Sequence, residues 1–396
     1  MKHHALTALG LVLALVFSTP VMATAAPLPD KALVVDGILL INKTYPIGPD
    51  YDPIPNAPDN KQLLPEAQKA FNEMRSAAQR EAGLNLFVLS GYRNYAYQQW
   101  LYNSYRANVG DYADTFSAKP GMSEHQSGLA ADIGDLRYPG ATLEVSFENT
   151  DAGQWLAANA PRFGFILRFP KGQEGVTGYQ YEPWHFRYVG RETAQRMTAA
   201  GVPTLEAWLG TDPSAGRALG YHKIGNVLVN RLPAPLGGYL IKGYHYYKLR
   251  DLAQALSGTA AAFSVDYDAD SREIILQRTP FASSEETISG ETGMPCRSAL
   301  MDDIRVRVDG GAFSLSRAVI DDFSYIKLRD LARPLGFKVD WQEAPPTVLL
   351  TTPEKPLAEP ENQFAGQGEQ GPSESAAPVE TPTTSDPAPS AGRTVG

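Results

Sequence analysis

The first part of the chain alternates between apolar stripes at helical spacing and short apolar runs. Residues 65–80 repeat apolar positions at helical spacing, begin at a proline and are followed by Gly83, which predicts a helix. Further short helices and buried strands follow it. Their expected ranges are a strand at 86–89, a helix around 98–105, a strand at 129–133, a helix at 154–158, and strands at 165–169 and 185–189. This order predicts an α+β fold, with helices flanking a mostly antiparallel sheet.

Beyond Gly210 the pattern changes and an internal repeat appears. The six residues 248–253 recur unchanged at 327–332, and each copy is preceded by tyrosine and followed by a strand-like alternation. A single unit of this size could hardly bury its own core. We therefore expect the two copies to pack together as one small α+β domain, which we place at residues 218–352.

The two ends of the chain differ from the middle in composition. Residues 1–25 combine a short polar start, an apolar stretch and a small-residue cleavage site, which is typical of an export signal peptide. Residues 26–60 are rich in Pro, Asp and Asn, and we interpret them as an extended lead-in. Residues 353–396 are rich in Pro, Glu, Ser and Thr and poor in aromatics, which predicts a disordered tail. The middle, residues 61–210, is then a first globular domain.

Charge and cysteine content narrow the function classes. The net charge of −9 argues against a general nucleic-acid or anionic-membrane binder. No later run approaches the ~20 apolar residues of a membrane span, so we expect none in the mature protein. Cys296 is the only cysteine, which excludes an internal disulfide and zinc sites of the multi-cysteine kind. Any metal must therefore be held by histidines and carboxylates.

The first domain has two histidines, and each lies in a dense polar motif. His125 belongs to the stretch Ser-Glu-His-Gln-Ser-Gly-Leu-Ala-Ala-Asp, which ends at Asp132. His185 ends the stretch Glu-Pro-Trp-His, which begins at Glu182. Residues three apart in a regular strand face opposite sides, but Pro183 favours a break that would let Glu182 and His185 converge.

Two histidines and one carboxylate around Zn²⁺, with a fourth position open, form a known hydrolytic arrangement. The metal would activate a water molecule, and a carboxylate that is not a ligand would act as general base. We favour Asp132 as the ligand and Glu182 as the base. Glu124 is an alternative for either role, although its place beside His125 favours an orientation away from the site.

These paired motifs resemble the D-alanyl-D-alanine carboxypeptidases of the VanY type, within the LAS group of zinc peptidases. The resemblance spans roughly residues 60–200 and includes Ser-Gly-Tyr-Arg at 90–93. It implies that His125, Asp132 and His185 are the zinc ligands and that Glu182 is the catalytic base. It also implies that Arg93 holds the terminal carboxylate of the substrate or the developing oxyanion. Two further residues would assist Arg93 in binding substrate: Ser123 and Gln98.

Together with the expected export signal, the resemblance implies a secreted carboxypeptidase that removes D-alanine from peptidoglycan stem peptides. An L,D-carboxypeptidase or a peptidoglycan endopeptidase with the same zinc site is the alternative, and a non-catalytic cell-wall-binding protein is an alternative of another class. The repeats resemble the N-terminal stalk module of copper amine oxidases, but His222 and His245 have no counterparts in the second copy, so we expect no copper site. We expect the repeats to bind the cell wall and the protein to be extracellular and wall-associated.

Overall fold

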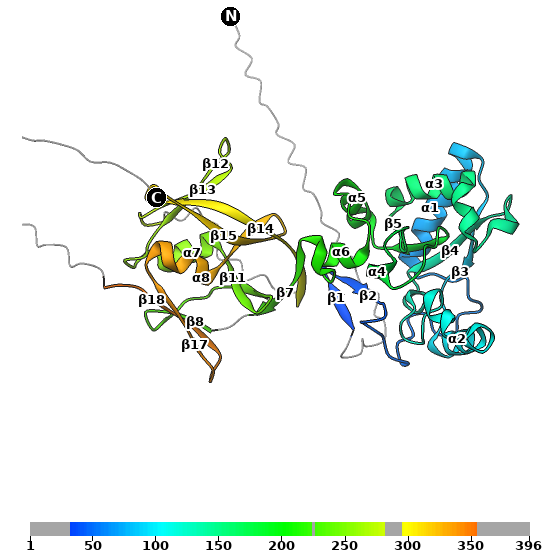
Figure 1. Cartoon of the computed structure of the whole chain (residues 1–396), viewed down its shortest axis with the longest axis horizontal. Helices are drawn as coiled ribbons and strands as arrows, with labels where there is room; N and C mark the ends of the chain where they lie inside the picture. The colour runs from blue at the N-terminus through cyan, green and yellow to red at the C-terminus, as the bar shows by residue number, and fades with distance from the viewer. Residues whose placement is uncertain (1–31, 224–225, 282–294, 355–396) are drawn as a thin grey trace, which may run out of the picture. The chain divides into compact units, whose positions relative to one another are not determined.

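The computed structural model describes residues 32–223, 226–281 and 295–354 (Figure 1). The expected signal peptide, the first residues of the lead-in and nearly all of the expected disordered tail lie outside these ranges. In the part of the chain that is described, none of the helices combines the length and apolar character needed to cross a membrane.

The first domain is built on a four-stranded antiparallel sheet in the order β3-β4-β6-β5. Mixed helix and sheet content was expected from the sequence, and the strands fall close to their expected ranges. β4 is buried along its whole length, and it lies between β3 and β6. The bounds are β3 (Leu86–Ser90), β4 (Ala130–Asp135), β5 (Phe165–Leu167) and β6 (His185–Tyr188).

Helices and short 3-10 turns surround this sheet. The helices are α1 (Pro65–Ala82), α2 (Tyr95–Val109), α3 (Asp151–Asn159), α4 (Glu174–Thr177), α5 (Arg191–Ala199) and α6 (Leu205–Leu209). The 3-10 turns are η1 (Gly110–Thr115), η2 (Glu124–Ser127), η3 (Pro139–Ala141), η4 (Val145–Asn149), η5 (Ala160–Phe163) and η6 (Pro213–Ala215).

The longest helix, α1, follows the sequence signals closely. Pro65 occupies its first turn, and Gly83 ends it in the left-handed conformation with φ of 63°. Its apolar face, including Phe71 and Met74, is buried in the same core as Ile133 of β4 and Phe186 of β6. This packing fixes the two strands that carry the polar motifs.

The segment expected to be an extended lead-in contains a hairpin. β1 (Leu33–Val35) pairs antiparallel with β2 (Ile38–Leu40). The turn consists of Asp36 and Gly37, both with positive φ, as a two-residue hairpin turn requires. The apolar residues on either side of this Asp-Gly turn supply the buried positions that a hairpin needs, so the expectation was wrong for residues 33–40.

The second half of the described chain is rich in strands. Its elements are β7 (Arg217–Lys223), β8 (Asn226–Val229), β9 (Leu232–Pro233), β10 (Gly238–Ile241), β11 (Tyr244–Lys248), α7 (Leu249–Leu256), β12 (Ser264–Asp268), β13 (Glu273–Gln277), β14 (Cys296–Val308), β15 (Gly311–Ile320), β16 (Phe323–Lys327), α8 (Leu328–Leu335), β17 (Lys338–Gln342) and β18 (Thr347–Thr351).

The two sequence copies take up equivalent structures. Each forms a strand that leads directly into a helix, β11 into α7 and β16 into α8, and the two strands pair antiparallel. The leucines of both helices lie in one core cluster. β7 pairs with β10 and also with β14, which closes the sheet around β15, β16 and β11. The likeness to the stalk module stays a prediction.

Candidate metal centre

His125 is placed by a tight turn that only glycine can close. η2 carries the histidine and ends at Gly128, which has φ of 70°. A Cβ at Gly128 would come within 3.0 Å of Ile54 and 3.1 Å of Leu64, so a side chain would be both strained and crowded there. The imidazole Nδ1 lies 2.6 Å from the carbonyl oxygen of Gly91. Because a carbonyl can only accept, Nδ1 carries the proton and Nε2 is left as the free lone pair.

Asp132 and His185 face each other across two paired strands. The register of β4 and β6 sets these two residues directly opposite. Oδ1 of Asp132 lies 3.0 Å from Nδ1 of His185, and Oδ2 lies 3.4 Å from Nε2 of His125. One ligand atom from each of the three residues falls within 4.8 Å of the other two, and all three residues are buried. Two imidazole nitrogens and one carboxylate oxygen at this spacing fit a zinc ion.

Glu182 reaches the same centre through the turn expected at Pro183. The backbone N–H of His185 donates to the carbonyl oxygen of Glu182 at 3.1 Å, which closes the turn just before β6 begins. Oε2 of Glu182 then lies 3.8 Å from Nδ1 of His185. The carboxyl group is buried beside the ligand cluster without belonging to it. A carboxyl group at this position is near enough to exchange a proton with a molecule bound at the centre.

Arg93 lies on the other side of Asp132. One terminal nitrogen of its guanidinium donates to Ser90 Oγ at 2.9 Å and lies 4.0 Å from Oδ2 of Asp132. Its Nε is buried and has no hydrogen-bond partner among the described residues. A buried guanidinium with an unused donor is suited to an anionic ligand, because a carboxylate can take both of its parallel N–H groups.

The two remaining substrate-binding candidates are placed differently. Ser123 is buried and lines the same hollow as Arg93. Gln98 is also buried, but its amide nitrogen donates to the carbonyl oxygen of Ala118 at 2.7 Å. Ala118 lines the hollow and Gln98 does not. Gln98 thus supports the wall of the pocket from behind, and its expected contact with substrate stays a prediction.

The hollow above the ligand cluster has a volume of about 220 Å³. This is smaller than the ~300–1,000 Å³ typical of pockets that enclose a drug-sized molecule, so it suits the end of a peptide. Sequence reasoning assigned no role to its apolar wall, because these residues come from α2 and from several separate loops. They are Leu101, Tyr105, Phe116, Met122, Leu143, Phe169 and Tyr179.

Glu124 is occupied elsewhere in the structure. Its Oε1 accepts from Arg168 Nε at 2.8 Å and from Arg187 at 2.9 Å. Its Oε2 faces Nε2 of His185, on the side of the ring opposite to Asp132. The carboxylate is therefore directed behind His185, which leaves Glu182 as the carboxyl group at the front of the cluster.

The environment separates the pKa values of the site residues. Burial and the Arg93 guanidinium lower the pKa of His125 to about 4. Burial acts in the same direction on His185, but the nearby carboxylates of Asp132, Glu124 and Glu182 outweigh it and raise the pKa of His185 to about 9. Burial raises the pKa of Glu182 to about 8, although His185 acts against it. Burial alone would raise the pKa of Asp132, yet the two histidines hold it well below its usual range.

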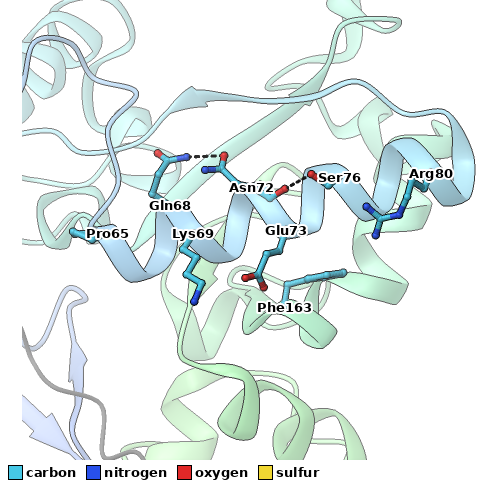
Figure 2. Close-up of a pocket in the computed structure, with 8 residues that line it drawn as sticks. All are labelled: Pro65, Gln68, Lys69, Asn72, Glu73, Ser76, Arg80 and Phe163. Atoms are coloured by element: carbon cyan, nitrogen blue, oxygen red, sulfur yellow. Dashed lines mark hydrogen bonds between the residues drawn. The ribbon is translucent and has the colours of Figure 1, made fainter.

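A second hollow, of about 610 Å³, follows the exposed side of α1 (Figure 2). It shares no lining residue with the pocket above the ligand cluster. Its polar groups bond to one another along the helix, since Gln68 donates to Asn72 and Ser76 donates to the carbonyl of Asn72. No group there is both buried and unpaired, so we assign it no chemistry.

Comparison with known proteins gives a family for the first domain. Residues 60–191 match the model of VanY, D-alanyl-D-alanine carboxypeptidase. YodJ of Bacillus subtilis, a putative carboxypeptidase by name, is 38% identical over 170 residues, which cover 40% of this chain and 62% of that protein. The chain thus spans less than two thirds of YodJ.

Among solved structures, the LdcB LD-carboxypeptidase shares 36% identity with a TM-score of 0.39, over 44% of this chain and 91% of that one. The structure of VanYB in complex with D-alanine-D-alanine shares 34% sequence identity with a TM-score of 0.37. The match covers 44% of this chain and 97% of that one.

A further relative covers the matched region almost completely. The bifunctional D-Ala-D-Ala dipeptidase and D-Ala-D-Ala carboxypeptidase VanXYC of Enterococcus gallinarum is 35% identical over 167 residues, which are 40% of this chain and 87% of that protein. Every residue of the candidate site lies within the matched stretch 60–191. The chain belongs to the VanY D-alanyl-D-alanine carboxypeptidase family.

Proposed function

We propose that this protein is a secreted, zinc-dependent carboxypeptidase that removes the terminal D-alanine from peptidoglycan stem peptides ending in D-Ala-D-Ala. The observation that carries the proposal is the convergence of three metal-ligating side chains, a free carboxyl group and a buried guanidinium on one small pocket. The named activities of VanXYC and of two other enterococcal D-alanyl-D-alanine carboxypeptidases support the choice of substrate.

His125, Asp132 and His185 would hold the zinc ion. When bound, zinc supplies a polarised scissile carbonyl and a water molecule whose pKa is lowered to about 7. The three ligands are buried and fixed by a glycine-closed turn and by strand pairing, so little ordering is needed when the metal arrives. The hydrogen bond from His125 to Gly91 orients the first imidazole with Nε2 toward the centre.

Glu182 would act as the general base. Its carboxyl group lies within 4 Å of a ligand atom but outside the ligand set, which supports a role beside the attacking water. It would take a proton from that water and pass it to the amine of the departing D-alanine.

Arg93 would bind the terminal carboxylate of the peptide and so select for an exopeptidase reaction. Its guanidinium lines the pocket, and Nε has an unused proton to donate. An anion here would lie close to the Asp132 carboxylate, which Arg93 also screens. The apolar wall around Tyr105, Phe116 and Leu143 would exclude water from this end of the substrate.

We further propose that the protein acts outside the cell and that residues 218–352 hold it at the cell wall. The export signal expected at residues 1–25 supports the first part of this proposal. The second part rests on the resemblance of the repeats to a secreted stalk module. N-terminal sequencing of the exported protein, and binding of the full chain to purified walls, would test the two parts separately.

Mass spectrometry of defined muropeptides tests the reaction. Pentapeptide, tetrapeptide and a cross-linked dimer are incubated with the zinc-loaded protein, and a chelator-treated sample serves as control. Loss of one D-alanine from the pentapeptide alone is the expected result. Shortening of the tetrapeptide would favour the L,D-carboxypeptidase, and cleavage of the dimer would favour the endopeptidase. If none of the three substrates gives a product, the alternative of a non-catalytic wall-binding protein is favoured.

A further inference from the structure

Four buried charged side chains form a closed cluster behind the metal centre. They are Glu124, Arg168, Arg187 and Glu206, and none is more than 4% exposed. The two positive and two negative groups balance one another. Buried ions of this kind are costly unless they are paired and hydrogen-bonded. Nothing in the proposed reaction uses the cluster directly, so its role has to come from what it holds in place.

The cluster fixes the carboxylate of Glu124 from one side. Arg168 donates two parallel hydrogen bonds to Glu206, at 2.7 and 2.8 Å, and turns its Nε to Oε1 of Glu124 at 2.8 Å. Arg187 donates to the same Oε1 at 2.9 Å. Because guanidinium groups are planar forks with fixed donor directions, the position of Glu124 is determined by two of them. Its second oxygen, Oε2, is left free.

That free oxygen faces a free nitrogen. Glu124 Oε2 and His185 Nε2 are both buried, and among the described residues neither has a hydrogen-bond partner. The two atoms lie 3.7 Å apart. A shift of about 0.7 Å would bring them into hydrogen-bond range. Since buried polar atoms rarely stay unpaired, each atom is the natural partner of the other.

We propose that Glu124 is a positioning residue for His185. It accepts the Nε2 proton of the imidazole, which keeps the lone pair of Nδ1 directed at the ligand cluster. The inference rests on the zinc binding that the proposed function includes. It gives the two metal-ligating histidines opposite tautomers: His125 is protonated at Nδ1 by its bond to Gly91, and His185 is protonated at Nε2 by Glu124.

The support for Glu124 extends beyond the stretch that matches the family. Asn42 donates to Oε1 of Glu206 at 3.0 Å, and Arg187 donates to the carbonyl oxygen of Leu39 at 2.8 Å. Leu39, Asn42 and Glu206 all lie outside residues 60–191. The N-terminal hairpin segment and α6 thus complete the buried cluster. We infer that these flanking segments belong to the working metal centre.

The tautomers can be read in the unchanged protein. With ¹⁵N-labelled histidine and ¹¹³Cd in place of zinc, the ring nitrogen that binds the metal is coupled to cadmium and the other carries a proton. We expect coupling to Nε2 of His125 and to Nδ1 of His185. The Nε2 proton of His185 should exchange slowly with water, because its acceptor is buried. Coupling of cadmium to Nε2 of His185, or fast exchange of that proton, would overturn the proposal.

Glu124→Gln tests the role of the carboxylate in metal affinity. The amide has only one oxygen. If that oxygen keeps its hydrogen bonds to the two arginines, the NH₂ group faces the N–H of His185, and two donors then oppose each other. Outer partners of this kind typically contribute 10–100-fold to metal affinity, and we expect a loss in that range by chelator competition. Glu81→Gln is the matched control, since Glu81 makes a paired contact with Arg162 at the surface.

The variant experiment separates this inference from the proposed function. If the wild type binds no zinc, the proposed metal centre itself fails. If the wild type binds zinc and folded Glu124→Gln binds it equally well, only the role of Glu124 fails. Should Glu124→Gln not fold, Glu206→Gln keeps Glu124 in place while weakening its support through Arg168. For Glu206→Gln we expect a smaller loss of zinc affinity, of several-fold, together with faster exchange of the His185 Nε2 proton. If both the affinity and the exchange rate are unchanged, the inference is contradicted.

Discussion

Zinc binding should release nearly two protons at neutral pH. In the metal-free protein the pKa of His185 is raised to about 9 and that of Glu182 to about 8, so at pH 7 both groups hold a proton. A metal ligand must be deprotonated, and a base beside a cation is ionised as well. From these two pKa values the bound protons at pH 7 amount to about 1.9, and at pH 9 to about 0.6.

The same values set the pH dependence of zinc affinity. Both pKa values are raised above those of the free side chains, so the protons are held tightly at low pH and compete with the metal there. These two side chains should make the logarithm of the association constant rise by about two per pH unit up to pH 7, and their contribution should fall to about 0.6 per pH unit at pH 9.

Isothermal titration calorimetry measures this count directly. Zinc is titrated at pH 7 in two buffers of different ionisation enthalpy, and the difference in observed heat gives the protons released. Glu182→Gln cannot hold the second proton and should release about one. Glu174→Gln removes an exposed carboxyl group from the start of α4 and should behave as the wild type. A release near zero at pH 7, or equal values for the wild type and Glu182→Gln, would refute the reasoning.

Three further predictions concern the reaction. Glu182→Gln should retain zinc, measured by elemental analysis, and lose about 10²–10⁴-fold in kcat, whereas a loss below tenfold would move the base elsewhere. His185→Ala should lose most of its zinc on dialysis, because only two protein ligands remain, and full occupancy would contradict the ligand set. Arg93→Lys should raise KM for peptides ending in a free carboxylate, since a point charge replaces a two-pronged donor. Wild-type cleavage of amidated peptides at the same rate would remove Arg93 from that role.

Local signals in the sequence were sufficient for the main elements of the first domain. The helix at Pro65 and the strand that carries Asp132 follow from apolar spacing, proline and glycine, which act over a few residues. The two histidine motifs also identified the candidate metal ligands. The hairpin at residues 33–40 was missed although its Asp-Gly turn is a local signal, because the surrounding prolines and polar residues dominated the interpretation.

The buried charge cluster could not be inferred from the sequence. Arg168 and Arg187 lie at or beside strand ends, where charged residues usually reach solvent. Their partners are distant along the chain: Glu206 is 38 residues from Arg168, and Glu124 is 63 residues from Arg187. Gln98 makes a contact of the same kind, since its amide nitrogen donates to the backbone carbonyl of Ala118, 20 residues away. Such pairings depend on tertiary packing, which no local pattern encodes.

Because Asp132 and His185 lie opposite each other on paired strands, the distance between these two ligands does not depend on the segment that connects the strands. Strand register sets the distance between these ligands, whatever the length of the excursion between β4 and β6. That excursion begins with a loop, residues 136–150, which brings the exposed Leu143 to the rim of the pocket. The loop could therefore be exchanged for another to alter which peptide ends are accepted while the affinity for metal stays the same. In such a scaffold, substrate specificity can be changed by transferring loops from related proteins.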